Sequence, residues 1–112
     1  MYLPEIYKNF SENFPDVLKN YQQLGIACRE AGPLDPKSQD LVKLGIAVGI
    51  NSRGAIMSHT RKALASGATP EEIVHGVLLA LTTVGFPKMM SAMALVNSVL
   101  DEKASCNIEA AQ

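Results

Sequence analysis

The sequence predicts an all-α, single-domain helical bundle, and three observations lead to this fold class. A length of 112 residues suits one compact domain and leaves little room for a second. Apolar residues recur at helical spacing along the chain, and no block alternates as a strand does. Proline, glycine and capping residues separate the apolar blocks, as they do between the helices of a bundle.

The first block, residues 4–31, is expected to form a short helix followed by a longer one. Its apolar positions are Ile6, Phe10, Phe14, Val17, Leu18, Tyr21, Leu24 and Cys28. Pro15 divides the block, because proline lacks the amide donor and clashes with the preceding turn. Gly32 and Pro33 end it.

The next helix opens with Asp35 as N-cap and Pro36 at the first helical position. It is expected to run to about Gly49. Its buried face is predicted to hold Leu41, Leu44 and Val48. The short connection that follows, residues 49–51, predicts that this helix and the next are antiparallel neighbours.

The following helix begins near Ser52, a good N-cap, and ends at Ser66 and Gly67, where glycine can adopt the left-handed conformation. Thr69, Pro70 and Glu72 then form a capping box with proline at the first helical position. This next helix is expected to reach about Thr83.

The last helix is predicted from residues 86–87 to about Lys103. Residues 1–103 are therefore assigned to one domain, and residues 104–112 to a polar C-terminal tail. No internal repeat interrupts this organisation.

Charge and hydropathy exclude several function classes. The formal charge is −1, with acidic and basic residues interspersed, so no basic stripe is available for nucleic acid. The N-terminus lacks an apolar signal core. The apolar stretch 73–100 is interrupted at residues 85–88, which leaves pieces shorter than the ~20 residues of a membrane span. We expect a cytoplasmic protein with no membrane segment.

The two cysteines, Cys28 and Cys106, are far apart and in no CxxC pair. This spacing suits neither a zinc site nor a dithiol redox centre. We expect reduced thiols and no metal site.

One polar group of residues lies in the helix that begins near Ser52. Ser52, Ala55 and His59 fall close to one face, since separations of three, four and seven match helical turns. Amides at a helix N-terminus attract anions, so a carboxylate can bind beside Ser52 and Arg53. His59 is then placed to move a proton. A lone histidine on a packed helix is, however, often a hydrogen-bonded structural residue, and the residue types alone leave both interpretations open.

Residues 40–96, DLVKLGIAVGINSRGAIMSHTRKALASGATPEEIVHGVLLALTTVGFPKMMSAMALV, resemble the carboxymuconolactone decarboxylase family, which has the AhpD-like fold. The features shared are an acidic residue that opens a helix, a histidine in the next helix followed by Ala-Leu, the GATPEEI segment, and GFP before the last helix. These features are specific for the fold and much less so for an activity.

The redox branch of that family uses a CxxC, a histidine and an upstream glutamate. Alignment on His59 places Ser52 and Ala55 at the cysteine positions and Asp40 at the glutamate position. A serine hydroxyl cannot form the sulfenate or disulfide that hydroperoxide reduction requires. The resemblance therefore favours the decarboxylase branch, which also lacks CxxC.

Decarboxylases of this family act without a cofactor on a small carboxylated lactone. The resemblance implies that His59 is the general acid, that Asp40 orients its imidazole, and that Arg53 and Ser52 bind the substrate carboxylate. Each residue also has a structural interpretation: Arg53 as an exposed first-turn residue and Asp40 as a residue favoured by the helix dipole.

Two alternative functions remain at this point. One is a non-catalytic helical oligomer that binds a small anion or a partner in the same cleft, and the other, the weakest, is a peroxidase without CxxC. His75 lies outside the recognised motif positions and is interpreted as structural or interfacial. Met57, Met89, Met90 and Met93 are interpreted as packing residues.

A homo-oligomer is also predicted, a trimer or a hexamer built from trimers. Charged residues make up only 19% of the chain, below the ~25% of an average soluble protein. The last two predicted helices are apolar on more than one face and need to be covered. The family resemblance implies trimers and hexamers.

Overall fold

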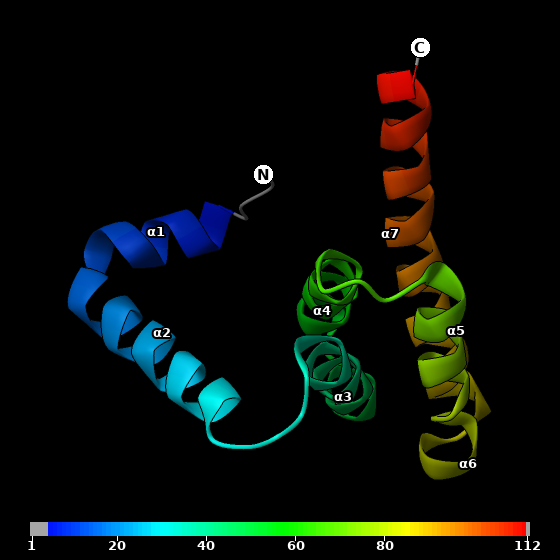
Figure 1. The fold of residues 1–112 in the computed structure, drawn as a ribbon, viewed down its shortest axis with the longest axis horizontal. Coiled ribbons are helices and arrows are strands. Elements are labelled where there is room, and N and C mark those ends of the chain that lie inside the picture. Colours follow the sequence, from blue (N-terminus) through cyan, green and yellow to red (C-terminus); the bar gives the residue numbers. More distant parts are fainter. Residues whose placement is uncertain (1–4, 112) are drawn as a thin grey trace. The chain divides into compact units, whose positions relative to one another are not determined.

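The computed structural model describes the backbone of residues 5–111 and the side chains of residues 5–104. Every regular element in this part of the chain is an α-helix, which confirms the predicted all-α class (Figure 1). The chain forms two compact units, residues 1–34 and residues 35–112, which are described separately. The family-like stretch 40–96 lies in the second unit.

The first unit contains α1 (Glu5–Asn13) and α2 (Pro15–Glu30), and the predicted division at Pro15 is confirmed. The two helices contact each other, and Gln22 Nε2 donates a hydrogen bond to Tyr7 Oη over 3.3 Å. The rings of Phe10 and Phe14 lie 5.4 Å apart. Neither helix has a buried residue, so the described residues of this unit form no core.

The second unit begins with α3 (Pro36–Gly49), for which Asp35 occupies the predicted N-cap position. A hydrogen bond with Ser38 is the main cause that lowers the pKa of Asp35. Ile50 is the C-cap of this helix, and Asn51 takes a positive φ of 56° in the turn that follows. Asparagine is one of the few residues that adopt this conformation readily.

Next comes α4 (Arg53–Ala65), capped by Ser52 as predicted and followed by Gly67 with a φ of +96°. The start of α4 contacts the end of α3, because the Ser52 amide donates to the Ala47 carbonyl over 3.1 Å. The end of α4 contacts the beginning of α3, because the Ser66 hydroxyl donates to the Asp40 carboxylate. Together these contacts confirm that α3 and α4 are antiparallel neighbours (Figure 1).

One predicted helix is divided in two, α5 (Pro70–Leu78) and α6 (Leu81–Val84). The expectation of one helix to about Thr83 was therefore wrong. The division falls at Leu79 and Ala80, where ψ falls to −20° and −18°. These values belong to 3₁₀ geometry, and the Ala80 amide bonds three residues back, to Val77, over 3.0 Å. Neither residue is a glycine or a proline, so the sequence carried no sign of the break.

The last helix, α7 (Phe86–Ala111), begins where predicted and extends beyond the expected end at Lys103. The segment 104–112 was predicted as a polar tail, and the described backbone is helical through Ala111. Gly85 precedes α7 with a φ of +95°, which allows the chain to turn sharply between α6 and α7.

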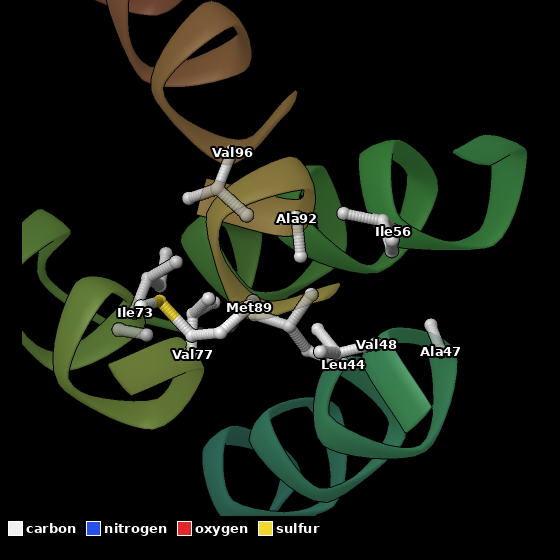
Figure 2. Close-up of a cluster of buried hydrophobic side chains, with 11 residues drawn as sticks. Leu44, Ala47, Val48, Ile56, Ile73, Val77, Met89, Ala92 and Val96 are labelled. Atoms are coloured by element: carbon white, nitrogen blue, oxygen red, sulfur yellow. The ribbon is translucent and has the colours of Figure 1, made fainter. Parts of the chain in front are cut away.

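The core of the second unit lies among α3, α4, α5 and α7, which contact one another (Figure 2). The predicted Leu44 and Val48 are buried in it, while Leu41 is partly buried against it. The buried hydrophobic cluster consists of Leu44, Ala47, Val48, Ile56, Ala63, Ala68, Ile73, Val77, Met89, Ala92 and Val96. This continuous cluster holds the hairpin of α3 and α4 against the other helices.

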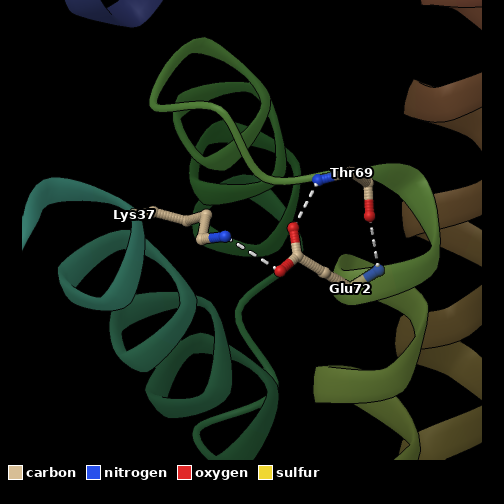
Figure 3. A network of polar contacts seen from close by, with 3 residues as sticks. All are labelled: Lys37, Thr69 and Glu72. Atoms are coloured by element: carbon tan, nitrogen blue, oxygen red, sulfur yellow. Dashed lines mark hydrogen bonds and ion pairs between the residues drawn. The ribbon is translucent and has the colours of Figure 1, made fainter.

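A polar network joins the starts of α3 and α5 (Figure 3). The Glu72 amide donates to Thr69 Oγ1 over 3.1 Å and the Thr69 amide donates to Glu72 Oε1 over 2.9 Å, which confirms the predicted capping box. Lys37 Nζ lies 2.9 Å from Glu72 Oε2. The Thr69 amide, followed by Lys37, lowers the pKa of Glu72, and the same ion pair raises the pKa of Lys37.

In the described part of the chain, no helix is both long enough and apolar enough to cross a membrane. Large apolar side chains are nevertheless exposed in both units. In the first unit the most exposed is Ile6, at 79%. In the second they are Val42, Ile46, Ile50, Leu78, Leu79, Phe86 and Met90.

Candidate functional site

Three of the predicted site residues, Ser52, Arg53 and His59, lie along α4 or at its N-cap, and the fourth, Asp40, lies on α3. Ser52, His59 and Ser66 follow one another at intervals of seven residues, close to two helical turns, so they lie near one side of the helix. All three side chains are half-buried. We call these three residues the α4 seam.

The N-terminal end of the seam is an open helix start. Ser52 Oγ accepts a hydrogen bond from the Ala55 amide over 3.4 Å, and Arg53 is exposed. The two positions that carry cysteines in the redox branch are therefore joined here by a helix cap. The remaining first-turn amides and the Arg53 guanidinium give this end a positive character that suits an anion.

His59 occupies the middle of the seam. Its side chain is half-buried, and its Nδ1 atom is shielded from solvent. The neighbouring Thr60 is fully buried and donates its hydroxyl to the Ile56 carbonyl over 2.7 Å, so this turn packs firmly against the core. The imidazole thus lies at the boundary between the core and the solvent.

The C-terminal end of the seam holds a buried carboxylate. Asp40 on α3 is only 2% exposed, and it accepts a hydrogen bond from Ser66. Ser66 was predicted only as a helix end, and its role as the partner of Asp40 was missed. The sequence carried no signal for this contact, because it joins two helices that are 26 residues apart at these positions.

The structure separates the predicted residues into two groups. Ser52 and Arg53 lie at the first turn of α4, whereas Asp40 contacts Ser66 at its last turn. A rise of 1.5 Å per residue places these ends about 20 Å apart, with His59 about 10 Å from each along the axis. The helix start and His59 therefore lie about two turns apart along α4, and the Asp40 carboxylate contacts the last turn. Direct pairing of Asp40 with His59 stays a prediction.

Other reactive residues lie elsewhere. Cys28 is exposed on α2 in the first unit, and the side chain of Cys106 lies outside the described residues. His75 is exposed on α5. Among the described side chains, no group of three or more histidines, cysteines or carboxylates is arranged to hold a metal ion.

Comparison with known proteins identifies the family. Residues 15–98 match the model of the carboxymuconolactone decarboxylase family, which covers most of the chain. The chain belongs to the carboxymuconolactone decarboxylase family. The resemblance seen in residues 40–96 is thereby confirmed, and the match extends into the first unit.

A relative from Haemophilus influenzae, described as an uncharacterized protein, is 34% identical over 61 residues. The aligned part is 52% of this chain and 54% of the relative, so the match spans about half of each protein. No solved structure matches the chain significantly. Family membership is therefore established, and the relative's description names no substrate.

Proposed function

We propose that this family member is a cofactor-independent carboxy-lyase that acts on a small carboxylated lactone or a related acid. The observation that carries the proposal is the α4 seam. It has an anion-attracting helix start at Ser52 and a half-buried imidazole about two turns further, and its last member, Ser66, contacts the buried carboxylate of Asp40. No redox cysteine stands at Ser52 or Ala55, so proton chemistry is the activity that these residues support.

In the proposed reaction the substrate carboxylate lies beside Ser52 and Arg53. The bond to the departing carboxylate breaks, carbon dioxide leaves, and the electron pair moves through the conjugated double bond to the lactone carbonyl oxygen. His59 then donates its proton to carbon, which restores the neutral lactone. General acid catalysis of this kind contributes about 10²- to 10⁴-fold to the rate.

Asp40 is the proposed positioning residue for His59. Its hydrogen bond from Ser66 holds the carboxylate on the side of α4 that carries His59. The proposal requires this carboxylate to contact the imidazole and orient it for proton donation. Ser66 acts through Asp40 and touches no reacting atom.

The second candidate is a non-catalytic oligomer that binds a small anion at the same helix start. The exposed apolar side chains on both units favour assembly of copies, which we propose as a trimer or hexamer. A free, exposed thiol at Cys28 agrees with the cytoplasm as the proposed compartment.

Turnover of carboxymuconolactone, followed by carbon dioxide release, tests the proposed function. His59→Gln is expected to lower kcat/KM about 10²- to 10⁴-fold. Lys62→Gln, an exposed change on the same helix, is the control and should leave turnover unchanged. Urea unfolding of both variants measures stability separately.

Three results would contradict the carboxy-lyase proposal. If His59→Gln loses activity only to the extent that it loses folded protein, the histidine is structural. No turnover of carboxymuconolactone or related lactone acids, together with carboxylate binding at Arg53, indicates the non-catalytic candidate. Dithiol-dependent hydroperoxide reduction that Cys28→Ser or Cys106→Ser abolishes indicates a peroxidase.

A further inference from the structure

Two contacts set the register of α3 against α4. At one end, the Ser66 hydroxyl donates a hydrogen bond to the Asp40 carboxylate. At the other end, the Ser52 amide donates to the Ala47 carbonyl over 3.1 Å. His59 lies midway between the two serines along α4. Its neighbours on α3 therefore come from the middle of the stretch between Asp40 and Ala47.

The middle of this stretch holds Lys43 and Leu44. Leu44 is 1% exposed and belongs to the core, whereas Lys43 is half-buried. At 100° per residue, Lys43 lies about 60° around the helix from Asp40 and about 40° from Ala47, the two residues that contact α4. Packed helices lie about 8–10 Å apart, a gap that a lysine side chain can span. Lys43 therefore has its ammonium group within reach of the space beside His59.

The charge of Lys43 is not engaged in the ion pairs that join the neighbouring helices. Lys37 on α3 pairs with Glu72 on α5 over 2.9 Å, and Arg61 on α4 pairs with Glu102 on α7 over 3.5 Å. Lys43 belongs to neither pair. Its ammonium group presents a positive charge and three hydrogen-bond donors, which suit a negatively charged oxygen.

The proposed decarboxylation creates such an oxygen. When carbon dioxide leaves, the electron pair moves to the lactone carbonyl oxygen, which becomes negatively charged. In the proposed reaction Ser52 and Arg53 bind the carboxylate and His59 supplies the proton, so none of these residues is assigned to the carbonyl oxygen. Stabilisation of a charge that develops in the transition state is usually the largest single contribution to catalysis.

We propose that the Lys43 ammonium binds the lactone carbonyl oxygen and stabilises the negative charge that develops there. The inference rests on the proposed function and adds a catalytic residue to the same site. As the bond to the departing carboxylate breaks, the carbonyl oxygen receives the electron pair and accepts a hydrogen bond from Lys43 Nζ. His59 then protonates carbon, the carbonyl is restored, and solvent returns a proton to His59. Lys43 keeps its own protons throughout.

The position of Lys43 level with His59 agrees with this assignment. The carbonyl oxygen and the carbon that receives the proton belong to one small conjugated unit of the substrate, so the groups that serve them need to lie close together. The helix start at Ser52 is about two turns of α4 away from His59. Lys43 is therefore better placed than Arg53 to contact this oxygen.

A set of lysine variants separates this role from a structural one. In the structural alternative, the aliphatic stem of Lys43 covers apolar surface and its ammonium is only solvated. Lys43→Met keeps an unbranched stem and removes the charge, whereas Lys43→Arg keeps the charge. Lys88→Met, at an exposed lysine on α7, is the matched control. Carbon dioxide release from carboxymuconolactone measures turnover, and urea unfolding measures stability.

We expect Lys43→Met to lower kcat by about 10²- to 10³-fold, as the loss of one oxyanion donor does, without a matching loss of stability. Lys43→Arg should keep more activity than Lys43→Met, and Lys88→Met should match the wild type. Addition of ethylammonium to Lys43→Ala should restore part of kcat, because a free cation can occupy the vacated position. A purely structural lysine would not respond to this rescue.

Full turnover by Lys43→Met would overturn the role of Lys43 and leave the carboxy-lyase proposal standing. A change confined to KM would also overturn it, because the interaction would then be the same in the ground state and the transition state. The same holds if kcat falls only as far as the folded fraction falls. A wild type that releases no carbon dioxide from carboxymuconolactone or related lactone acids would overturn the proposed function and the role of Lys43 with it.

Discussion

Every buried hydrophobic side chain among the described residues belongs to the second unit, from Leu44 to Val99, whereas α1 and α2 bury none. Both units are helical and amphipathic, so helical periodicity alone does not distinguish them. The second unit closes four helices around one cluster, while the first consists of two helices that leave their apolar residues in water. An amphipathic pattern therefore indicates that the apolar face of a helix needs to be covered, but it does not identify the segment that covers it.

The largest expected effect on stability comes from a core substitution in the second unit, compared with a matched substitution in the first. Leu44→Ala removes a side chain that is 1% exposed and should lower the free energy of unfolding by about 2–5 kcal/mol. The matched change Leu24→Ala, at 63% exposure in α2, should cost less than about 0.5 kcal/mol. Urea unfolding at one low protein concentration measures both. A comparable loss in Leu24→Ala would show that the first unit is covered in solution.

A smaller loss of stability is expected within the second unit when the buried carboxylate of Asp40 loses a hydrogen bond. Ser66→Ala removes the hydroxyl that donates to Asp40 and should cost about 1–3 kcal/mol, because a buried acceptor loses its donor. Ser58→Ala, at a half-buried serine outside the α4 seam, is the control. If the two variants unfold at the same urea concentration, the Ser66–Asp40 bond contributes nothing to stability.

The smallest effect concerns the exposed network at the starts of α3 and α5. The pKa of Glu72 is lowered in the folded state, so its contribution is present above the unfolded pKa and is lost as pH falls through the folded value. Glu72→Gln should therefore lower the thermal midpoint slightly at pH 7, and the difference from wild type should vanish in strong acid. Melting curves across this pH range provide the measurement, and a difference that persists in acid would contradict the ionic origin.

Much of the fold was predictable because its signals are local. Proline at the first turns of three helices, the capping box at Thr69, and the glycine after Ser66 each act within a few residues. The division between α5 and α6 was not predictable, since Leu79 and Ala80 are ordinary helix formers. The short α6 that follows the break contacts α7, and helix propensity does not reveal such a tertiary contact.

The candidate site was predictable in part for the same reason. Ser52 and His59 are seven residues apart on one helix, so their spacing alone indicates a shared side of α4, and Arg53 is next to Ser52 in the sequence. Asp40 comes from another helix, and the sequence did not show that Ser66 holds it. Its burial depends on the antiparallel pairing of α3 with α4, which is a tertiary contact. Residue spacing within one helix could not establish that contact.

The tight turn at Asn51 also has a consequence for how the chain folds. Residues 50–52 join α3 to α4, so the contacts of this hairpin close only a short loop. Small loops cost little entropy, and local contacts form early, so we expect the hairpin to be structured in the folding transition state before α7 docks. Ala47→Gly in the hairpin should then slow refolding, while Val99→Ala near the end of the core should mainly speed unfolding. The helix pair that carries the candidate site would then be the earliest part of the chain to acquire its native structure.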